Sequence, residues 1–116
     1  MTDQIELLMY SRSYGCPYIS IAKRVLSEHA LAYREIFIDK DADAKARVIE
    51  WTGFQSVPTM IVTEPGGILP IAPPSPLAKG ASPRGIDRGA MITEASMDEL
   101  ERWLRKHGFI PAEAEA

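Results

Sequence analysis

Cys16 is the residue of this chain most suited to chemistry. It is the sole cysteine among 116 residues, so no disulfide can form within the chain. A single cysteine is most often a small buried hydrophobic residue. This one is followed by Pro17 and stands where a predicted apolar strand ends and a helix begins. Free backbone N–H groups and the helix dipole favour a thiolate at such a place, so Cys16 is predicted to be a reactive nucleophile.

A second motif, Val57-Pro58-Thr59, opens a run of apolar and β-branched residues. Taken alone, Pro58 has an ordinary explanation, because proline is tolerated at the first residue of a strand or on an edge strand. The run that it opens, residues 59–63, is rich in β-branched residues and predicts a strand. Whether this motif belongs with Cys16 depends on the fold.

The hydrophobic pattern predicts alternating strands and helices around the two motifs. Pro17 suits the first turn of a helix, where its missing N–H would have no partner. Ser96 and Glu99 have the spacing of a capping box. A helix between the first two strands implies that these strands are parallel neighbours. The strands are expected at residues 5–11, 33–39, 59–63 and 90–93, and the helices at about residues 16–29, 42–52 and 97–107.

One segment differs in composition from the rest of the chain. Residues 64–89 hold six prolines and five glycines, and they make a connection far longer than the usual length of about five residues. Ile68 and Leu69 could still form a brief strand within it. Three charged residues near its end could fold over the active site, although a solvated loop is the simpler interpretation: Arg84, Asp87 and Arg88.

The length and composition predict one soluble globular domain, residues 1–116, with a frayed tail at residues 111–116. The net charge of −3 and the scatter of the basic residues argue against a nucleic-acid partner. The first residues lack the basic flank and apolar run of a signal peptide, and no stretch is long enough to span a membrane. One unpaired cysteine without an export signal predicts a cytoplasmic location.

Together, these motifs resemble those of the glutaredoxins, a family of the thioredoxin-fold superfamily. The resemblance rests on residues 9–18 (MYSRSYGCPY), residues 52–59 (TGFQSVPT) and the last strand and helix, and it covers about residues 4–63 and 90–107. It implies an α/β thioredoxin-like fold, with a four-stranded mixed sheet flanked by helices and the insertion before the last strand. In this family the proline aligned with Pro58 is cis and lies against the cysteine. The backbone before that proline pairs with an extended thiol substrate.

The resemblance also implies how a small thiol such as glutathione is held. A basic residue before the cysteine meets a carboxylate, and Arg12 is the candidate, one residue farther from Cys16 than in many members. The start of the last helix meets the γ-glutamyl end, since a helix N-terminus attracts anions. Ser96 and the Met97 backbone fit that role and Asp98 could pair with the ammonium, although capping alone would explain Ser96. The implied thiol-binding residues are Arg12, Tyr18, Val57, Pro58, Thr59, Ser96, Met97 and Asp98, with Gly15 and Pro17 supporting Cys16.

Two further assignments stay open. A rival alignment places Gly85-Ile86-Asp87 on the family's Gly-Gly-x-Asp segment, but that segment should lie between the last strand and its helix, so the first alignment is preferred. Gln55 could approach the same pocket, or it could be a solvated loop residue.

The chain departs from the dithiol glutaredoxins at one decisive position. Their motif is Cys-Pro-Tyr-Cys, whereas this chain has Ile19 in the fourth place. Without a resolving cysteine, Cys16 cannot release a mixed disulfide by an internal attack. The departure predicts monothiol exchange, in which Cys16 takes glutathione or a similar small thiol from a mixed-disulfide protein substrate and a second thiol regenerates it.

Two other functions compete with this one. Two chains could share a [2Fe–2S] cluster through Cys16 thiolates and two glutathiones, although that subfamily carries Cys-Gly-Phe-Ser and an extended loop before the cysteine. Alternatively, the domain could be a binding module without turnover, since Ile19 is bulky and apolar. Neither histidine has the partner spacing of a metal ligand, so no other metal site is predicted. We expect a monomer, or a dimer if a cluster is bound.

Overall fold

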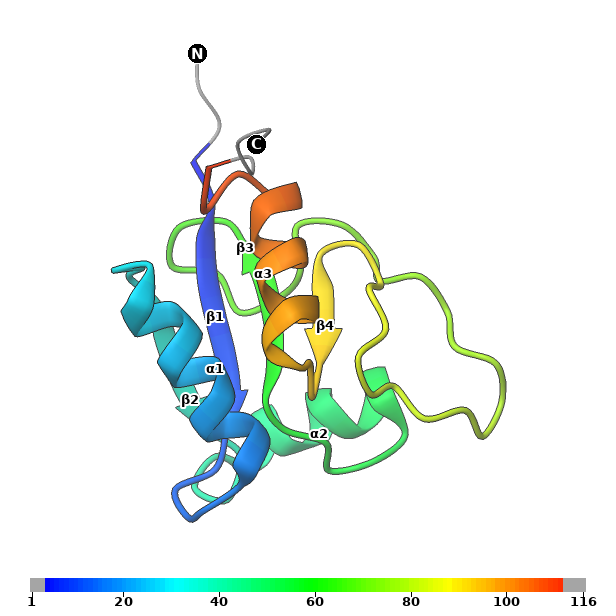
Figure 1. Cartoon of the computed structure of the whole chain (residues 1–116). Helices are drawn as coiled ribbons and strands as arrows, with labels where there is room; N and C mark the ends of the chain where they lie inside the picture. The colour runs from blue at the N-terminus through cyan, green and yellow to red at the C-terminus, as the bar shows by residue number, and fades with distance from the viewer. Residues whose placement is uncertain (1–3, 112–116) are drawn as a thin grey trace.

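The computed structural model describes residues 4–111, and within this range the chain folds into four strands and three helices (Figure 1). The elements are β1 (Glu6–Ser11), α1 (Pro17–Glu28), β2 (Arg34–Phe37), α2 (Ala42–Thr52), β3 (Thr59–Thr63), β4 (Met91–Thr93) and α3 (Met97–Lys106). The order expected from the sequence is confirmed. Within the described range, no helix combines the length and the hydropathy required to cross a membrane.

The strands form one mixed sheet in the order β2-β1-β3-β4. β1 and β2 are parallel, as their connecting helix implied, and β3 is antiparallel to both of its neighbours. The carboxyl ends of β1, β2 and β4 therefore lie at the same edge of the sheet as the start of β3. The register places Thr59 opposite Tyr10 on one side and opposite Thr93 on the other. We call this edge the carboxyl edge, and Cys16 follows the strand at its centre.

The helices cover both faces of the sheet because side chains along each strand point alternately to opposite faces. Leu7 and Met9 of β1 belong to a core that also contains residues of α1 and α3. Leu8 and Tyr10 belong to a second core that contains residues of α2 and the start of α1. In Figure 1, α1 and α3 lie together on the near face of the sheet. The result is a three-layer arrangement that agrees with the expected thioredoxin-like fold.

Element boundaries differ slightly from the expectation. The first helix begins at Pro17 rather than Cys16, which is instead its N-cap residue with extended backbone. β2 is shorter than the predicted strand at residues 33–39. No strand forms at Ile68 and Leu69. The Ile68 carbonyl accepts a hydrogen bond from the Tyr10 hydroxyl at 2.5 Å. Pro70 has no N–H to donate, and the Ile71 N–H after it donates to the Val62 carbonyl of β3 at 2.9 Å.

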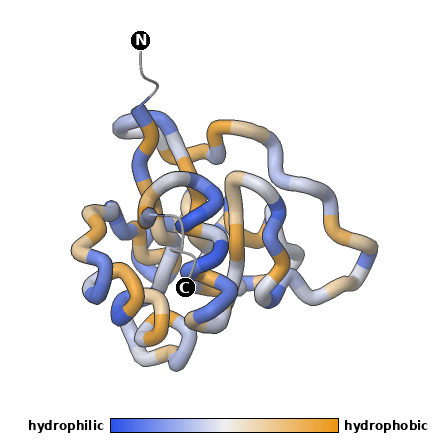
Figure 2. Tube along the Cα trace, turned by 45° about the horizontal axis from the view of Figure 1, so that its top comes forward, coloured by the Kyte–Doolittle hydropathy of each residue, from blue (hydrophilic) through white to orange (hydrophobic). Residues whose placement is uncertain are grey.

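The insertion leaves the end of β3 and returns to the start of β4, and in Figure 1 it extends beyond β4. Its one bridge to the sheet joins Arg84 to Thr93. Figure 2 shows hydrophobic stretches along the insertion, and among them the side chains of Ile68, Leu69 and Ile71 are exposed. Of the predicted frayed tail at residues 111–116, all but Pro111 lies outside the described residues.

Candidate thiol site

Cys16 lies at the amino end of a well-formed helix. As the N-cap of α1 it has φ −156° and ψ 128°, and the following proline occupies the first turn. The residue is 9% exposed, so the sulfur sits at the surface of the second core and not on an open loop. Its thiol donates to the Val57 carbonyl, with 3.7 Å between sulfur and oxygen. The two motifs singled out in the sequence therefore meet at one place.

The loop that carries Val57 is held by bonds from the neighbouring strands. The Val57–Pro58 peptide bond is cis, as the resemblance implied, and the Pro58 carbonyl accepts from the Glu94 N–H at 2.9 Å. Thr59 is fully buried, and its hydroxyl bonds to the Ser56 carbonyl at 2.9 Å and to the Thr93 hydroxyl at 3.0 Å. The Thr59 side chain thus supports the loop from inside the protein.

A polar cavity of about 190 Å³ lies at the carboxyl edge, between the loop that precedes Cys16 and the residues that follow β2. Arg12 lines it, with its guanidinium 4.7 Å from the centre of the Tyr14 ring. Within residues 4–111, the Nε atom of Arg12 is buried and has no hydrogen-bond partner. The rest of the lining comes from separate elements: Tyr14, Ile38, Asp39, Lys45 and Gln55. Two cations, one carboxylate and an amide thus line this polar space.

The carboxylate of Asp39 in this cavity already has a partner. It accepts hydrogen bonds from the backbone N–H and from the hydroxyl of Ser13. The hydrogen bond from the Ser13 hydroxyl is the main reason that the pKa of Asp39 lies below its ordinary value. Asp39 therefore stays ionised at neutral pH and adds one negative charge to the cavity that Arg12 and Lys45 line.

The start of α3 is less open than the resemblance implied. The Ser96 hydroxyl accepts from the Glu99 N–H at 3.2 Å, and the Glu99 carboxylate accepts from the Ser96 N–H at 2.8 Å. This is the capping box expected from the sequence. Met97 is half-buried against the first core, whereas Asp98 is exposed. Of the three residues, Asp98 has the side chain best placed to meet a ligand from solvent.

Comparison with known proteins agrees with this geometry. The family model of the glutaredoxins matches residues 7–64, a stretch that contains Cys16, the cis proline and all the residues that line the cavity. This chain belongs to the glutaredoxin family. It is 29% identical over 59 residues to "Glutaredoxin-C4, chloroplastic" of rice, Oryza sativa subsp. japonica. That match spans 48% of this chain and 44% of the rice protein, so the chain covers less than half the length of that relative.

The residues that flank Cys16 show how this glutaredoxin differs from a dithiol member. Ile19 is 6% exposed and packs in the same core as Cys16, so the fourth motif position contributes a hydrophobic contact. Tyr18 is half-buried against that core, and Pro17 is exposed. Gly15 has no positive φ, and a Cβ there would meet no atom within 4 Å. The backbone freedom of glycine is therefore not required at Gly15.

Sequence reasoning missed two residues of this glutaredoxin's carboxyl edge. Lys45 reaches the cavity from the first turns of α2, and its place next to the buried Ala44 was the available signal. Glu94, with φ +48°, holds the Pro58 carbonyl through its N–H. No local pattern predicts that contact, since it depends on the pairing of β3 with β4. Among residues 4–111, no group of three or more histidine, cysteine or acidic side chains could hold a metal ion.

Proposed function

We propose that this glutaredoxin is a monothiol thiol–disulfide oxidoreductase that exchanges mixed disulfides of glutathione, or of a similar small thiol, through Cys16. The observation that carries the proposal is the position of Cys16. It is the N-cap of α1 and lies 3.7 Å from the carbonyl that precedes the cis proline. A helix N-terminus supports a thiolate, and the carbonyl of an extended segment can accept from the backbone of a bound peptide.

The exchange proceeds in two balanced steps. The Cys16 thiolate attacks the glutathione sulfur of a mixed disulfide, so that a new disulfide to glutathione forms and the substrate leaves as a thiolate that takes a proton from water. A second glutathione thiolate then attacks the glutathione sulfur on Cys16. Cys16 is released as a thiolate and glutathione disulfide is the product. In sum, the substrate sulfur is reduced to a thiol and one reduced glutathione is consumed, because its sulfur joins the glutathione of the mixed disulfide in the product.

Loss of the thiol proton also frees the Val57 carbonyl. In the thiol form this oxygen accepts from Cys16, whereas a thiolate has no proton to donate. The carbonyl can then accept from the amide of the bound thiol and align its sulfur with Cys16. The Val57 carbonyl thereby takes part both in the deprotonation of Cys16 and in the binding of the substrate thiol.

The cavity at the carboxyl edge supports a carboxylate-bearing thiol as co-substrate. Arg12 and Lys45 bring two positive charges to it, and Gln55 adds an amide. Arginine can bind a carboxylate with two parallel hydrogen bonds. The partly buried Nε of Arg12, which has no partner within the described residues, is a donor that such a carboxylate would satisfy.

Mass spectrometry and turnover test the proposal together. The wild-type protein, incubated with glutathione disulfide, should gain one glutathione on Cys16, and reduced glutathione should remove it. It should also release glutathione from a glutathionylated peptide in the presence of reduced glutathione, whereas Cys16→Ser should do neither. Ser20→Ala, a change at an exposed hydroxyl in the same helix, serves as the matched control and should retain both activities.

The same preparation separates the competing functions. Absorbance of a [2Fe–2S] chromophore after incubation with iron, sulfide and glutathione, together with dimer formation, would favour the cluster carrier. Absence of both the glutathione adduct and the chromophore would leave a binding module. Either result would contradict monothiol exchange as the main activity.

A further inference from the structure

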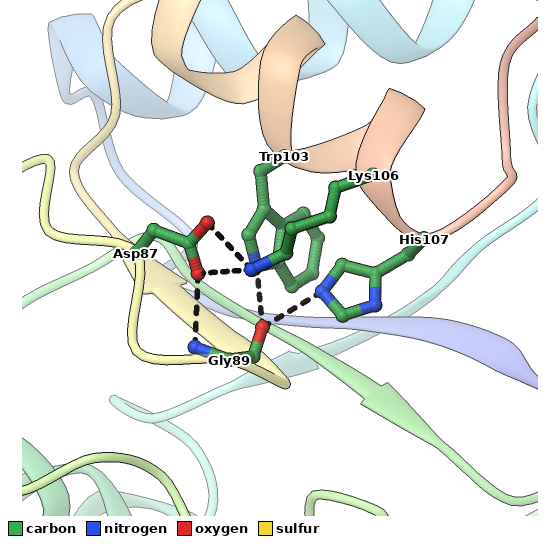
Figure 3. Close-up of polar contacts among 5 residues, drawn as sticks. All are labelled: Asp87, Gly89, Trp103, Lys106 and His107. Atoms are coloured by element: carbon green, nitrogen blue, oxygen red, sulfur yellow. Dashed lines mark hydrogen bonds and ion pairs between the residues drawn. The ribbon is translucent and has the colours of Figure 1, made fainter. Parts of the chain in front are cut away.

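The last part of the insertion is held firmly against α3. Figure 3 shows Asp87 paired with Lys106 and the Gly89 carbonyl receiving two donors. The Lys106 ammonium lies 2.6 Å from an Asp87 oxygen, and the Gly89 carbonyl accepts from Trp103 Nε1 at 2.8 Å and from His107 Nε2 at 2.7 Å. The end of the insertion is therefore a defined part of the fold.

A buried arginine secures the same segment from the other side. Arg88 is 5% exposed, and its guanidinium donates to the Trp51 carbonyl at 2.5 Å and to the Ser75 carbonyl at 2.8 Å. Its N–H groups therefore link the segment to the end of α2 and to the middle of the insertion.

These anchors place Arg84 next to the thiol site. Its backbone bridges to Thr93, and the Gly85 N–H donates to the Thr93 carbonyl at 2.7 Å. The Arg84 guanidinium lies 5.1 Å from the centre of the Tyr18 ring and 3.6 Å from the Glu94 carboxylate. Tyr18 packs on the core that contains Cys16, and the Glu94 N–H holds Pro58. Arg84 thus contacts both residues that border the thiol and the cis proline.

The topology places Arg84 and Arg12 on opposite sides of Cys16. Arg12 follows β1 and lines the cavity toward β2, whereas Glu94 follows β4 at the other end of the sheet order. Between them lie Cys16 and the Val57–Pro58 loop. We infer that Arg84, which the insertion supplies, is a specificity-determining residue of this chain that binds the γ-glutamyl α-carboxylate of a glutathione-type substrate on the Tyr18 side of Cys16. This inference rests on the proposed function.

Arg84 has the capacity for such a ligand. Its side chain is 58% exposed, whereas that of Glu94 is 16% exposed, so solvent and ligands reach the cation more easily than its partner. A guanidinium carries five N–H donors in a planar fork, and a single ion pair at 3.6 Å leaves most of them free. Stacking on Tyr18 holds the plane of the group next to the thiol site.

Paired probes test this assignment. The first probe is a peptide glutathionylated with ordinary glutathione, and the second carries glutathione whose γ-glutamyl α-carboxylate is amidated. Arg84→Gln should lower kcat/KM about tenfold with the first probe and less than twofold with the second. The wild-type protein should prefer the first probe by a similar factor. Lys79→Gln, which removes another exposed cation of the insertion, should leave both rates unchanged.

A binding measurement keeps this test separate from the chemistry. S-methylglutathione cannot exchange, so its dissociation constant and that of its α-amide report recognition alone. Arg84→Gln should weaken binding of the first ligand about tenfold and leave the amide unaffected. An equal loss of affinity for both ligands would show that Arg84 only supports the loop. The assignment would also be overturned if Arg84→Gln lost no affinity, or if the wild-type protein bound neither ligand. Selective loss of binding without any exchange in the wild-type protein would instead contradict the proposed function alone.

Discussion

The half of the chain that matches the glutaredoxin family and the half that follows it reach the same edge of the sheet by different means. Residues 7–64 form a compact set of short-range connections, in which a strand, a capped helix and a proline loop bring Cys16 to Val57. The insertion has no regular element and depends on anchors to α2 and α3. The first half carries Cys16, and the second half places Arg84 against Tyr18 and Glu94.

This difference indicates a division of labour. In the proposed function, the chemistry depends on Cys16 and the Val57–Pro58 loop, which lie within the match to the family, whereas the inferred recognition depends on the insertion, which leaves the sheet intact. The two cations illustrate the point. Arg12 belongs to the loop next to the thiol, while Arg84 comes from a segment outside the match to the family. Variants at four positions, Cys16, Arg88, Arg12 and His107, would break or sharpen this comparison.

The largest effect is expected at the nucleophile. Cys16→Ser should reduce exchange to the uncatalysed rate, because a hydroxyl cannot form the mixed disulfide. The fold should persist, since serine differs from cysteine by one atom and the site is at the edge of a core. Turnover and thermal unfolding measured on the same sample check both statements. Residual turnover above the uncatalysed rate would show that the reactive group lies elsewhere.

The anchoring of the insertion through Arg88 should contribute to the free energy of unfolding of the protein. Arg88→Met should lower the free energy of unfolding by about 2–3 kcal/mol, because the part-buried carbonyls of Trp51 and Ser75 lose hydrogen bonds from a charged donor. Arg102→Met, at an exposed position of α3, should cost less than about 0.5 kcal/mol. Urea unfolding of both variants gives the comparison. Equal costs would show that the insertion is not anchored through Arg88.

Cys16 reactivity provides a second readout on the Arg88 variant. The rate of alkylation by iodoacetamide should stay within about twofold of the wild type, because the contacts of Cys16 come from α1 and the Val57 loop. A large change in this rate would mean that the two halves of the molecule are not separable in the way described.

The cavity cation should affect binding more than chemistry. Arg12→Gln should raise KM for a glutathionylated peptide about tenfold, equivalent to about 1.4 kcal/mol, and change kcat by less than about twofold. The reason is that Arg12 contacts the cavity and not the sulfur. Steady-state kinetics check the split, with Arg102→Gln as a distant control. A fall in kcat at constant KM would place Arg12 in the chemical step.

The smallest effect is a pH dependence of the anchor on α3. Burial lowers the pKa of His107 from its ordinary value of 6.5, so between the folded and unfolded pKa values the unfolded chain binds more protons. The contribution of neutral His107 to the free energy of unfolding is therefore fully present above pH 6.5. It declines as the pH falls from 6.5 through the lower pKa of the folded state. Unfolding temperatures from pH 8 to pH 5 should show this decline, and His107→Gln, which keeps a donor for the Gly89 carbonyl, should make it shallower.

Asp87 offers an internal control for that experiment. Burial raises its pKa, but hydrogen bonds from Lys106 and from the Gly89 N–H outweigh this effect and leave the pKa below its ordinary value of 3.8. Its contribution is present above pH 3.8 and is lost only as the pH falls through the folded pKa. When the same measurement is extended to pH 3, a decline confined to pH values below 4 in the wild-type protein would attribute the acid sensitivity to Asp87 and not to His107.

Much of this glutaredoxin follows from its sequence. Pro17 in the first helical turn and the Ser96–Glu99 capping box are local signals, and both work because helix ends leave backbone groups that only nearby residues can satisfy. The parallel pair β1–β2 follows from the helix between them. The meeting of Cys16 with Val57 was expected from the resemblance of two short motifs. In each case, residues close in sequence or a known topology were sufficient to predict the contact.

The tertiary structure alone decided the rest. Lys45 joins Arg12 in one cavity because α2 packs beneath the second core, and Glu94 reaches Pro58 because β4 pairs with β3. Arg84 was one charged residue among several in a segment rich in proline and glycine. Its place beside Tyr18 depends on three separate contacts. Arg88 donates to the Trp51 carbonyl, the Gly89 carbonyl accepts from Trp103, and the Arg84 backbone bridges to Thr93. Such contacts join residues distant in sequence, and the free energy that stabilises them comes from burial, which no local pattern records.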